Sequence, residues 1–186
     1  MLRSLYCHLM PPQGAPCGAV ATSSGCALRV GAHRGAMCHA PENTIAAFEA
    51  AIATGVFRIE CDVRMTSDGV LVLMHDDTVD RTTNGNGVLR QMSYSEVKSL
   101  RAITGAGGGE GSEPVPTLAE ALRCAKGKCR LLVELKDEDI AAAVVSEIER
   151  AGMVSDCTIS SFHERERGDM SHATSLSYLS LPHPSR

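Results

Sequence analysis

The sequence predicts an α/β fold with a largely parallel sheet, and three observations support this prediction. Short segments rich in Val, Ile and Leu alternate along the chain with segments whose apolar residues have helical spacing. Two helix starts carry the capping-box pattern, Ser93-x-x-Glu96 and Thr117-x-x-Glu120. The 186 residues are enough for one domain with a hydrophobic core. Alternation of this kind places successive strands side by side and parallel.

The predicted strands span residues 27–32, 57–66, 70–74, 130–134 and 157–162, and the predicted helices span 41–55, 93–100, 117–127 and 137–151. Three further segments do not follow the alternation. Residues 1–27 have no periodicity and are expected to form an unfolded leader. Residues 76–116 are polar and glycine-rich, which indicates an insertion within the domain, residues 28–162. Residues 163–186 are expected to form an unfolded tail.

Composition excludes several classes of protein. The net charge of -4, without a run of Lys or Arg, argues against nucleic-acid binding. No stretch of about 20 apolar residues indicates a transmembrane segment. The eight cysteines are scattered without a C-x-x-C pair, which argues against a zinc site and favours a reducing compartment such as the cytoplasm. The start of the chain is poor in acidic residues, so organellar targeting stays open.

Glu60 and Asp62 are the first candidates for chemistry. Side chains two residues apart on a strand share a face, so both carboxylates project together while Cys61 points away. Two such carboxylates repel each other unless a cation lies between them, and oxygen ligands suit Mg²⁺ or Ca²⁺. The alternative is a polar strand end that faces solvent.

The Asp68-Gly69 pair predicts a tight hairpin after this strand. With these two residues at the tip, Asp62 falls opposite His75 on the next strand. Cross-strand partners have Cβ atoms roughly 5 Å apart, so the imidazole is expected beside the carboxylates. A histidine in that place is suited to general acid–base catalysis.

Two more pairs follow predicted strands. His33 and Arg34 end the first strand, where an imidazole and a guanidinium can serve proton transfer and phosphate binding. Glu134 and Lys136 share a face at the end of a later strand and can supply a third carboxylate and a phosphate-binding ammonium. The alternative for each pair is an ordinary surface polar group or ion pair.

Together, these motifs and their order resemble the glycerophosphodiester phosphodiesterase family over residues 28–162. The matching stretches are His33-Arg34-Gly35, Pro41-Glu42-Asn43-Thr44, Ala47-Phe48, Glu60-x-Asp62, Asp68-Gly69, His75-Asp76, Thr82-Thr83-Asn84-Gly85, Val115-Pro116-Thr117-Leu118 and Glu134-x-Lys136. The resemblance implies a TIM barrel of the (β/α)8 type, which in this chain is expected to be truncated after about five strands.

The resemblance also implies hydrolysis of glycerophosphodiesters to glycerol 3-phosphate and an alcohol with a divalent cation, Mg²⁺ or Ca²⁺. In this family's roles, Glu60, Asp62 and Glu134 are the metal ligands. His33 and His75 are the acid and base, and Arg34 and Lys136 bind phosphate. Two alternatives stay open: a phosphodiesterase of the lysophospholipase D or sphingomyelinase type, and a catalytically inactive truncated product. The oligomeric state is not predicted.

Overall fold

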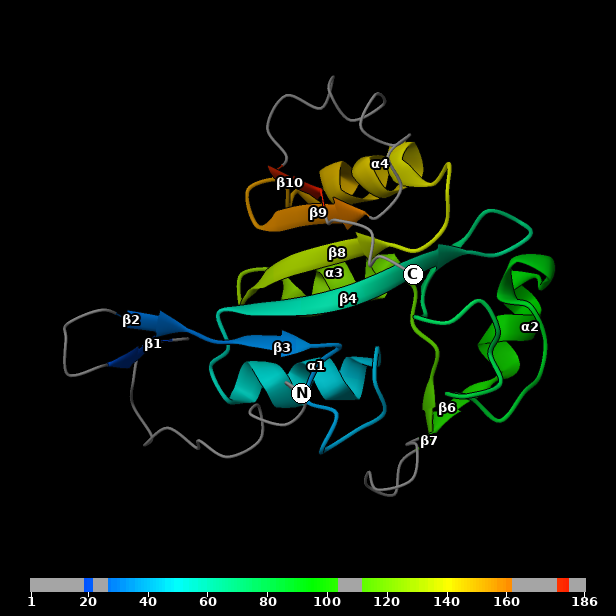
Figure 1. Cartoon of the computed structure of the whole chain (residues 1–186), viewed down its shortest axis with the longest axis horizontal. Coiled ribbons are helices and arrows are strands. Elements are labelled where there is room, and N and C mark those ends of the chain that lie inside the picture. The colour runs from blue at the N-terminus through cyan, green and yellow to red at the C-terminus, as the bar shows by residue number, and fades with distance from the viewer. Residues whose placement is uncertain (1–18, 22–26, 104–111, 162–176, 181–186) are drawn as a thin grey trace, which may run out of the picture.

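The computed structural model describes residues 19–21, 27–103, 112–161 and 177–180. Its main sheet has five parallel strands in the order β10-β9-β8-β4-β3, with β5 antiparallel beside β4 (Figure 1). The strands are β3 (Gly31–His33), β4 (Arg58–Met65), β5 (Leu71–Leu73), β8 (Arg130–Leu135), β9 (Cys157–Ser161) and β10 (Ser177–Ser180). This alternation of parallel strands and helices agrees with the α/β prediction.

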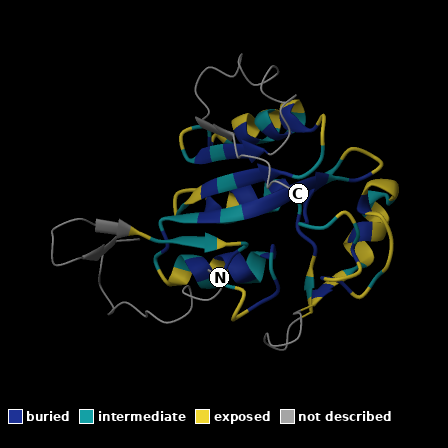
Figure 2. Ribbon diagram, viewed as in Figure 1, coloured by how far each residue is buried: buried dark blue, intermediate teal, exposed yellow. Residues whose placement is uncertain are grey.

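Three helices pack on one face of the sheet: α1 (Ile45–Ala53), α3 (Leu118–Ala125) and α4 (Ala141–Ala151). Helix α3 contacts both α1 and α4, and the main core lies between the helices and the strands (Figure 2). Alternate strand residues such as Ile59, Cys61 and Val63 enter this core. The intervening residues of β4 and β8 therefore face the opposite side of the sheet.

Local sequence signals explain where the helices begin. Ser93 and Thr117 each form a complete capping box, with Glu96 and Glu120 respectively, which confirms both predicted starts. Thr44 is the N-cap of α1 and its hydroxyl accepts from the Ala47 amide at 3.2 Å. These starts depend on contacts within one turn, which is why sequence predicts them well.

The predicted insertion, residues 76–116, contains a short 3₁₀ helix (Leu89–Gln91), α2 (Tyr94–Ser99) and the antiparallel pair β6 (Arg101–Ile103) and β7 (Ser112–Pro114). A second hydrophobic cluster holds it together, and its buried members are Val72, Met74, Val79, Leu89, Val97 and Val115. Because Val72 belongs to β5, the insertion shares its core with the hairpin that follows β4.

Several predicted bounds are wrong. The strand expected over 27–32 is replaced by two strands, β2 (Ala27–Arg29) and β3. Strand β2 pairs with β1 (Ala19–Ala21), which lies inside the expected leader. Helix α4 begins at Ala141 rather than Asp137, because Asp139 has a φ of 64°, which is incompatible with a helix. Strand β10 lies in the expected tail, whereas residues 162–176 are outside the described residues.

The hairpin register is also wrong by one residue. Val63 pairs with Leu73 and Met65 with Leu71, so the loop has three residues, Ser67 to Gly69. Gly69 has a φ of 85° as the last loop residue, as in three-residue hairpins that end on a left-handed residue. A two-residue tip would have placed His75 opposite Asp62. The Met74 amide instead donates to the Asp62 carbonyl at 3.0 Å.

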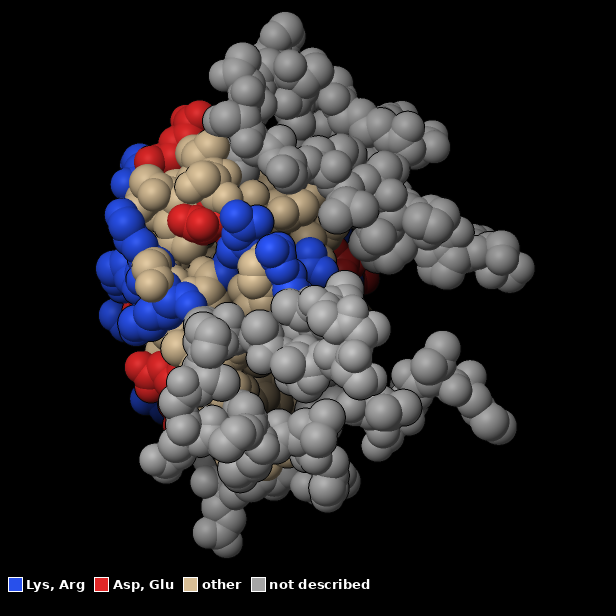
Figure 3. Space-filling view, turned by 90° about the vertical axis from the view of Figure 1, so that its left-hand side faces the viewer, with Lys and Arg blue, Asp and Glu red and all other residues tan. Residues whose placement is uncertain are grey.

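Lys and Arg side chains gather on the face of the molecule that Figure 3 shows. Arg58 and Arg130 pair at the amino ends of β4 and β8, and Arg29 and Arg130 both stack on the Phe57 ring. The Glu60, Asp62 and Glu134 carboxylates lie further along the same strands.

Among the described residues, no helix is both long and apolar enough to cross a bilayer.

We expect Gly35→Ala to destabilise the fold much more than Gly69→Ala. Both glycines have positive φ, 86° and 85°, so either alanine incurs backbone strain of about 1 kcal/mol. A Cβ on Gly35 would also lie 2.7 Å from the Ala47 Cβ and 2.8 Å from the Ala47 carbonyl carbon, whereas a Cβ on Gly69 meets nothing within 4 Å. Overpacking against a helix backbone brings the expected loss for Gly35→Ala to roughly 3 kcal/mol. Chemical denaturation measures both losses, and equal values would contradict this account.

Candidate active site

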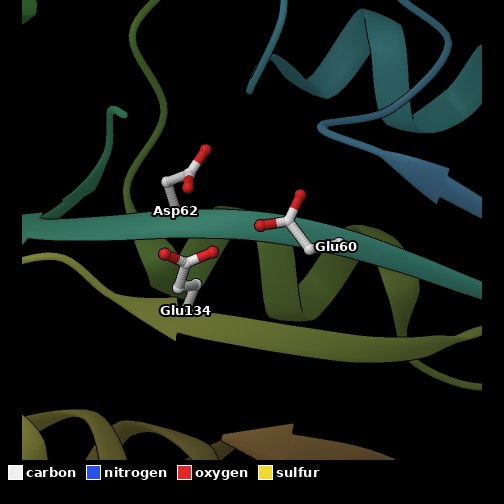
Figure 4. Close-up of side chains that lie close together, drawn as sticks. All are labelled: Glu60, Asp62 and Glu134. Atoms are coloured by element: carbon white, nitrogen blue, oxygen red, sulfur yellow. The ribbon is translucent and has the colours of Figure 1, made fainter. Parts of the chain in front are cut away.

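Three carboxylates come together on the face of the sheet away from the helices (Figure 4). Glu60 and Asp62 project from β4, and Glu134 projects from β8 at the position paired with Asp62. One oxygen from each residue lies within 4.8 Å of the others. Asp62 is fully buried and Glu134 is 9% exposed, so this is not a solvated acidic surface.

The cluster is electrostatically strained. Burial raises the pKa of Glu60 to about 8, and the charges of Asp62 and Glu134 add to the increase. Glu60 Oε1 is buried and makes no hydrogen bond with the described residues, and the buried Asp62 Oδ1 has only the Lys136 ammonium, 3.1 Å away, as a partner among them. Buried carboxylate oxygens in this state are suited to a divalent cation, and an all-oxygen set suits Mg²⁺ or Ca²⁺. The residues present therefore fit a bound cation.

Two cationic side chains border the carboxylates. The Arg34 Nε lies 3.0 Å from Asp62 Oδ2, and the Lys136 Nζ lies 3.1 Å from Asp62 Oδ1. Lys136 also donates a hydrogen bond to Glu134. A guanidinium and an ammonium next to a carboxylate set are suited to an anionic ligand such as a phosphodiester.

His33 lies at the exposed edge of the cluster. Its Nε2 is 3.7 Å from Glu60 Oε2, and its side chain is 55% exposed. Partial burial lowers the pKa of His33, and the nearby Arg34 charge lowers it further against the raising effect of the carboxylates. This lowering of the pKa favours the neutral imidazole, which is the form that accepts a proton.

His75 does not lie opposite Asp62 as predicted, and other contacts hold it. The Arg64 Nε and Nη2 donate to the His75 carbonyl at 3.1 and 3.0 Å, which holds the backbone after β5. The His75 Nδ1 lies 2.6 Å from Asp76 Oδ1. His75 lines a small pocket together with Glu42 and Asn43 from the loop before α1. Within the described residues, it makes no direct hydrogen bond to the three carboxylates.

Asn43 contacts one of the three carboxylates, and it was not among the predicted site residues. Its Nδ2 donates to Asp62 Oδ2 at 2.9 Å, and its Oδ1 accepts from the Asp62 amide at 3.3 Å. Asn43 has a φ of 56°, a conformation that asparagine tolerates better than most residues. The available signal was its place in the family-like stretch Pro41-Glu42-Asn43-Thr44, but no local spacing rule connects it to Asp62.

Ser160 and Arg81 were also missed. Ser160 pairs with Glu134 across β8 and β9, so it faces the same side, and its buried Oγ has no hydrogen-bond partner in the described part of the chain. Arg81 lies in the insertion and contacts Asp76 and Glu42. Sequence spacing gives no indication of either position, because both depend on how separate segments pack.

We expect the cation-free protein to lose stability as pH rises, and Glu60→Gln to remove that loss. The pKa of Glu60 in the folded chain is about 8, above its ordinary 4.5. Its contribution to stability is therefore full below the unfolded pKa and is lost as pH rises through about 8. Melting temperatures in chelator between pH ~6 and ~9 test this. Glu49→Gln, on the exposed side of α1, is the control, and an equal slope for Glu60→Gln and the unmodified chain would contradict it.

Comparisons with known proteins show which family this chain resembles. Residues 33–178 match the model of the glycerophosphoryl diester phosphodiesterase family. A glycerophosphodiester phosphodiesterase of Caldanaerobacter subterraneus is 45% identical over 106 residues, which are 56% of this chain and 44% of that protein. The chain spans about half the length of the first curated relatives it matches, or less.

Solved structures show the same fold. A glycerophosphodiester phosphodiesterase from Agrobacterium tumefaciens superposes with a TM-score of 0.73 at 39% identity, over 81% of this chain and 65% of that one. An Oleispira antarctica phosphodiesterase in complex with the product sn-glycerol-3-phosphate gives a TM-score of 0.70 at 28% identity, over 82% of this chain and 65% of that one. Together with the parallel sheet and the alternating helices, these neighbours confirm the predicted TIM-barrel fold class. The described strands form part of such a barrel.

Proposed function

Because the chain belongs to the glycerophosphoryl diester phosphodiesterase family, we propose that it hydrolyses glycerophosphodiesters to glycerol 3-phosphate and an alcohol. The observation that carries the proposal is the buried cluster of Glu60, Asp62 and Glu134 with Arg34 and Lys136 beside it. This combination of oxygen ligands and phosphate-binding cations matches what a phosphodiester and a divalent cation need together.

In this proposal, Glu60, Asp62 and Glu134 hold Mg²⁺ or Ca²⁺. The bound cation supplies electrostatic stabilisation of the charge that develops on the phosphate oxygens. Arg34 and Lys136 bind non-bridging phosphate oxygens and orient the diester. Asn43 holds Asp62 in place through two hydrogen bonds, so it positions one of the ligands.

The two histidines divide the proton transfers. One removes the proton from the attacking hydroxyl of water or of the substrate, and the other donates a proton to the leaving alkoxide. The lowered pKa of His33 suits proton abstraction. The Asp76 carboxylate can only accept, so His75 keeps a proton on Nδ1 in this contact. To donate to the leaving alkoxide, the ring carries a second proton on Nε2, and its loss leaves the neutral Nδ1–H tautomer.

The test is a hydrolysis assay of the full chain with glycerophosphocholine, glycerophosphoinositol and a lysophospholipid, each titrated with Mg²⁺ and Ca²⁺. The proposal expects cation-dependent release of glycerol 3-phosphate from the first two. Release from the lysophospholipid alone would support the lysophospholipase D type instead. No release from any substrate would contradict an active phosphodiesterase.

A thermal melt with and without the same cations separates folding from catalysis. A ligand that binds only the folded state raises its stability, by about 2.7 kcal/mol at a hundredfold excess over its Kd. A cooperative transition that shifts upward with cation is expected from a formed site. A melt without a transition would favour the catalytically inactive alternative.

A further inference from the structure

A continuous network of hydrogen bonds and ion pairs connects His75 to the carboxylate cluster. His75 contacts Asp76, Asp76 contacts Arg81, Arg81 contacts Glu42, and Glu42 accepts from the Arg34 Nη1 at 3.1 Å. Arg34 in turn lies against Asp62. These contacts join two segments that are separate in sequence: residues 34–42 before α1, and residues 75–81 after β5.

Arg81 is the central member of this network of contacts. Its guanidinium donates to Asp76 Oδ2 at 2.5 Å and Oδ1 at 3.0 Å, and to Glu42 Oε2 at 3.0 Å and Oε1 at 2.8 Å. Two carboxylates are thus each held by a pair of hydrogen bonds from one planar group, which lysine cannot reproduce.

The arrangement sets the state of both carboxylates. The hydrogen bonds from Arg81 lower the pKa of Asp76 well below its ordinary value. Burial raises the pKa of Glu42, but hydrogen bonds and charges from Arg81 and Arg34 outweigh it, and the net change is downward. Both groups therefore stay ionised and act only as acceptors at neutral pH.

The consequence for His75 is a fixed ring. Asp76 Oδ1 accepts from the His75 Nδ1 at 2.6 Å, and Arg81 prevents the carboxylate from rotating away. A histidine whose Nδ1–H donates to a held carboxylate keeps one tautomer and one orientation. An isolated ion pair at an exposed position contributes little to stability. The paired hydrogen bonds from Arg81 to Asp76 therefore point to a role in orienting the His75 ring rather than in stabilising the fold.

We propose that Arg81 is a positioning residue, which holds Asp76 so that His75 keeps its Nδ1–H tautomer, and which holds Glu42 against Arg34. This inference rests on the proposed function, in which His75 transfers a proton. Arg81 itself does not touch the reacting atoms. The insertion would thereby contribute to catalysis through one side chain.

The test compares Arg81→Gln and Arg81→Lys with Arg90→Gln in the full chain. Arg90 is a matched control because it also lies in the insertion, is 50% exposed against 48% for Arg81, and makes an ion pair, with Asp137 at 3.4 Å. We expect both Arg81 variants to lower kcat by about 10- to 100-fold, because misorientation of a catalytic group has costs of this size. Arg90→Gln is expected to keep the unmodified kcat.

Nitrogen-15 NMR of the imidazole groups gives a readout that a purely structural role would not change. The His75 signal is assigned by its loss in His75→Ala. The unmodified chain is expected to show the Nδ1–H tautomer, and Arg81→Gln a mixture of tautomers. A double variant with Asp76→Asn is expected to lose little more activity than either single variant, because both act through the same contact.

Three results would overturn the inference: an unchanged tautomer in Arg81→Gln, full activity in Arg81→Lys, or an equal loss in Arg90→Gln. Failure of the proposed function is distinguishable from these. In that case the unmodified chain hydrolyses no diester, while the tautomer measurement still decides whether Arg81 positions His75.

Discussion

His33→Ala and His75→Ala should each lower kcat by at least ~10²-fold, because each removes a group that transfers a proton in the proposed mechanism. His33 lies 3.7 Å from Glu60 and His75 is held by Asp76, so neither substitution removes a proposed cation ligand. The upward shift of the melting temperature with Mg²⁺ or Ca²⁺ should therefore remain in both variants.

His39→Ala is the matched control for these substitutions. His39 is exposed and lies in the loop that follows His33 and strand β3, and its ring contacts the neighbouring Cys38 rather than a carboxylate. Its removal should leave kcat unchanged. Hydrolysis near the unmodified rate in His33→Ala or His75→Ala would exclude that histidine from proton transfer.

Glu134→Gln should abolish the cation-dependent rise in melting temperature and lower kcat by about 10³-fold. The amide keeps the size of the side chain but removes one of three charged oxygen ligands, and metal stabilisation of the transition state is worth several kcal/mol. Lys136 keeps its contact with Asp62 at 3.1 Å, so the variant does not leave an ammonium without a carboxylate.

Isothermal titration of the full chain with Mg²⁺ and Ca²⁺ measures the affinity directly. Glu138→Gln, an exposed carboxylate four residues along the chain, is the control and should bind cation like the unmodified chain. If Glu134→Gln retained full affinity and full activity, the carboxylate cluster would not be the cation site.

The candidate site was predictable where a local rule sufficed. The alternation of side chains on a strand placed Glu60 and Asp62 on one face and Cys61 in the core, as the structure has them. The capping boxes at Ser93 and Thr117 were likewise predicted from spacing alone. Rules of this kind hold because the partners lie within one turn or one strand.

Prediction failed where the outcome depended on one backbone conformation. The Asp68-Gly69 pair indicated a hairpin, but Gly69 adopts positive φ as the third loop residue, and this shifts the register by one. His75 then lies outside the predicted pairing with Asp62. Its position depends instead on hydrogen bonds that Arg64 donates to its carbonyl and on the one that its Nδ1 donates to Asp76.

The sequence by itself determined the α/β class, the family motifs, and the carboxylates that the fold brings together with Arg34, Lys136 and His33. Only the tertiary structure decided how His75 is held, that Asn43 supports Asp62, and that Arg81 links the insertion to the loop before α1. The physical reason is the range of the contacts involved. Periodicity and capping act between near neighbours, whereas the Arg81–Glu42 contact joins residues 39 positions apart and exists only after the insertion packs against the sheet.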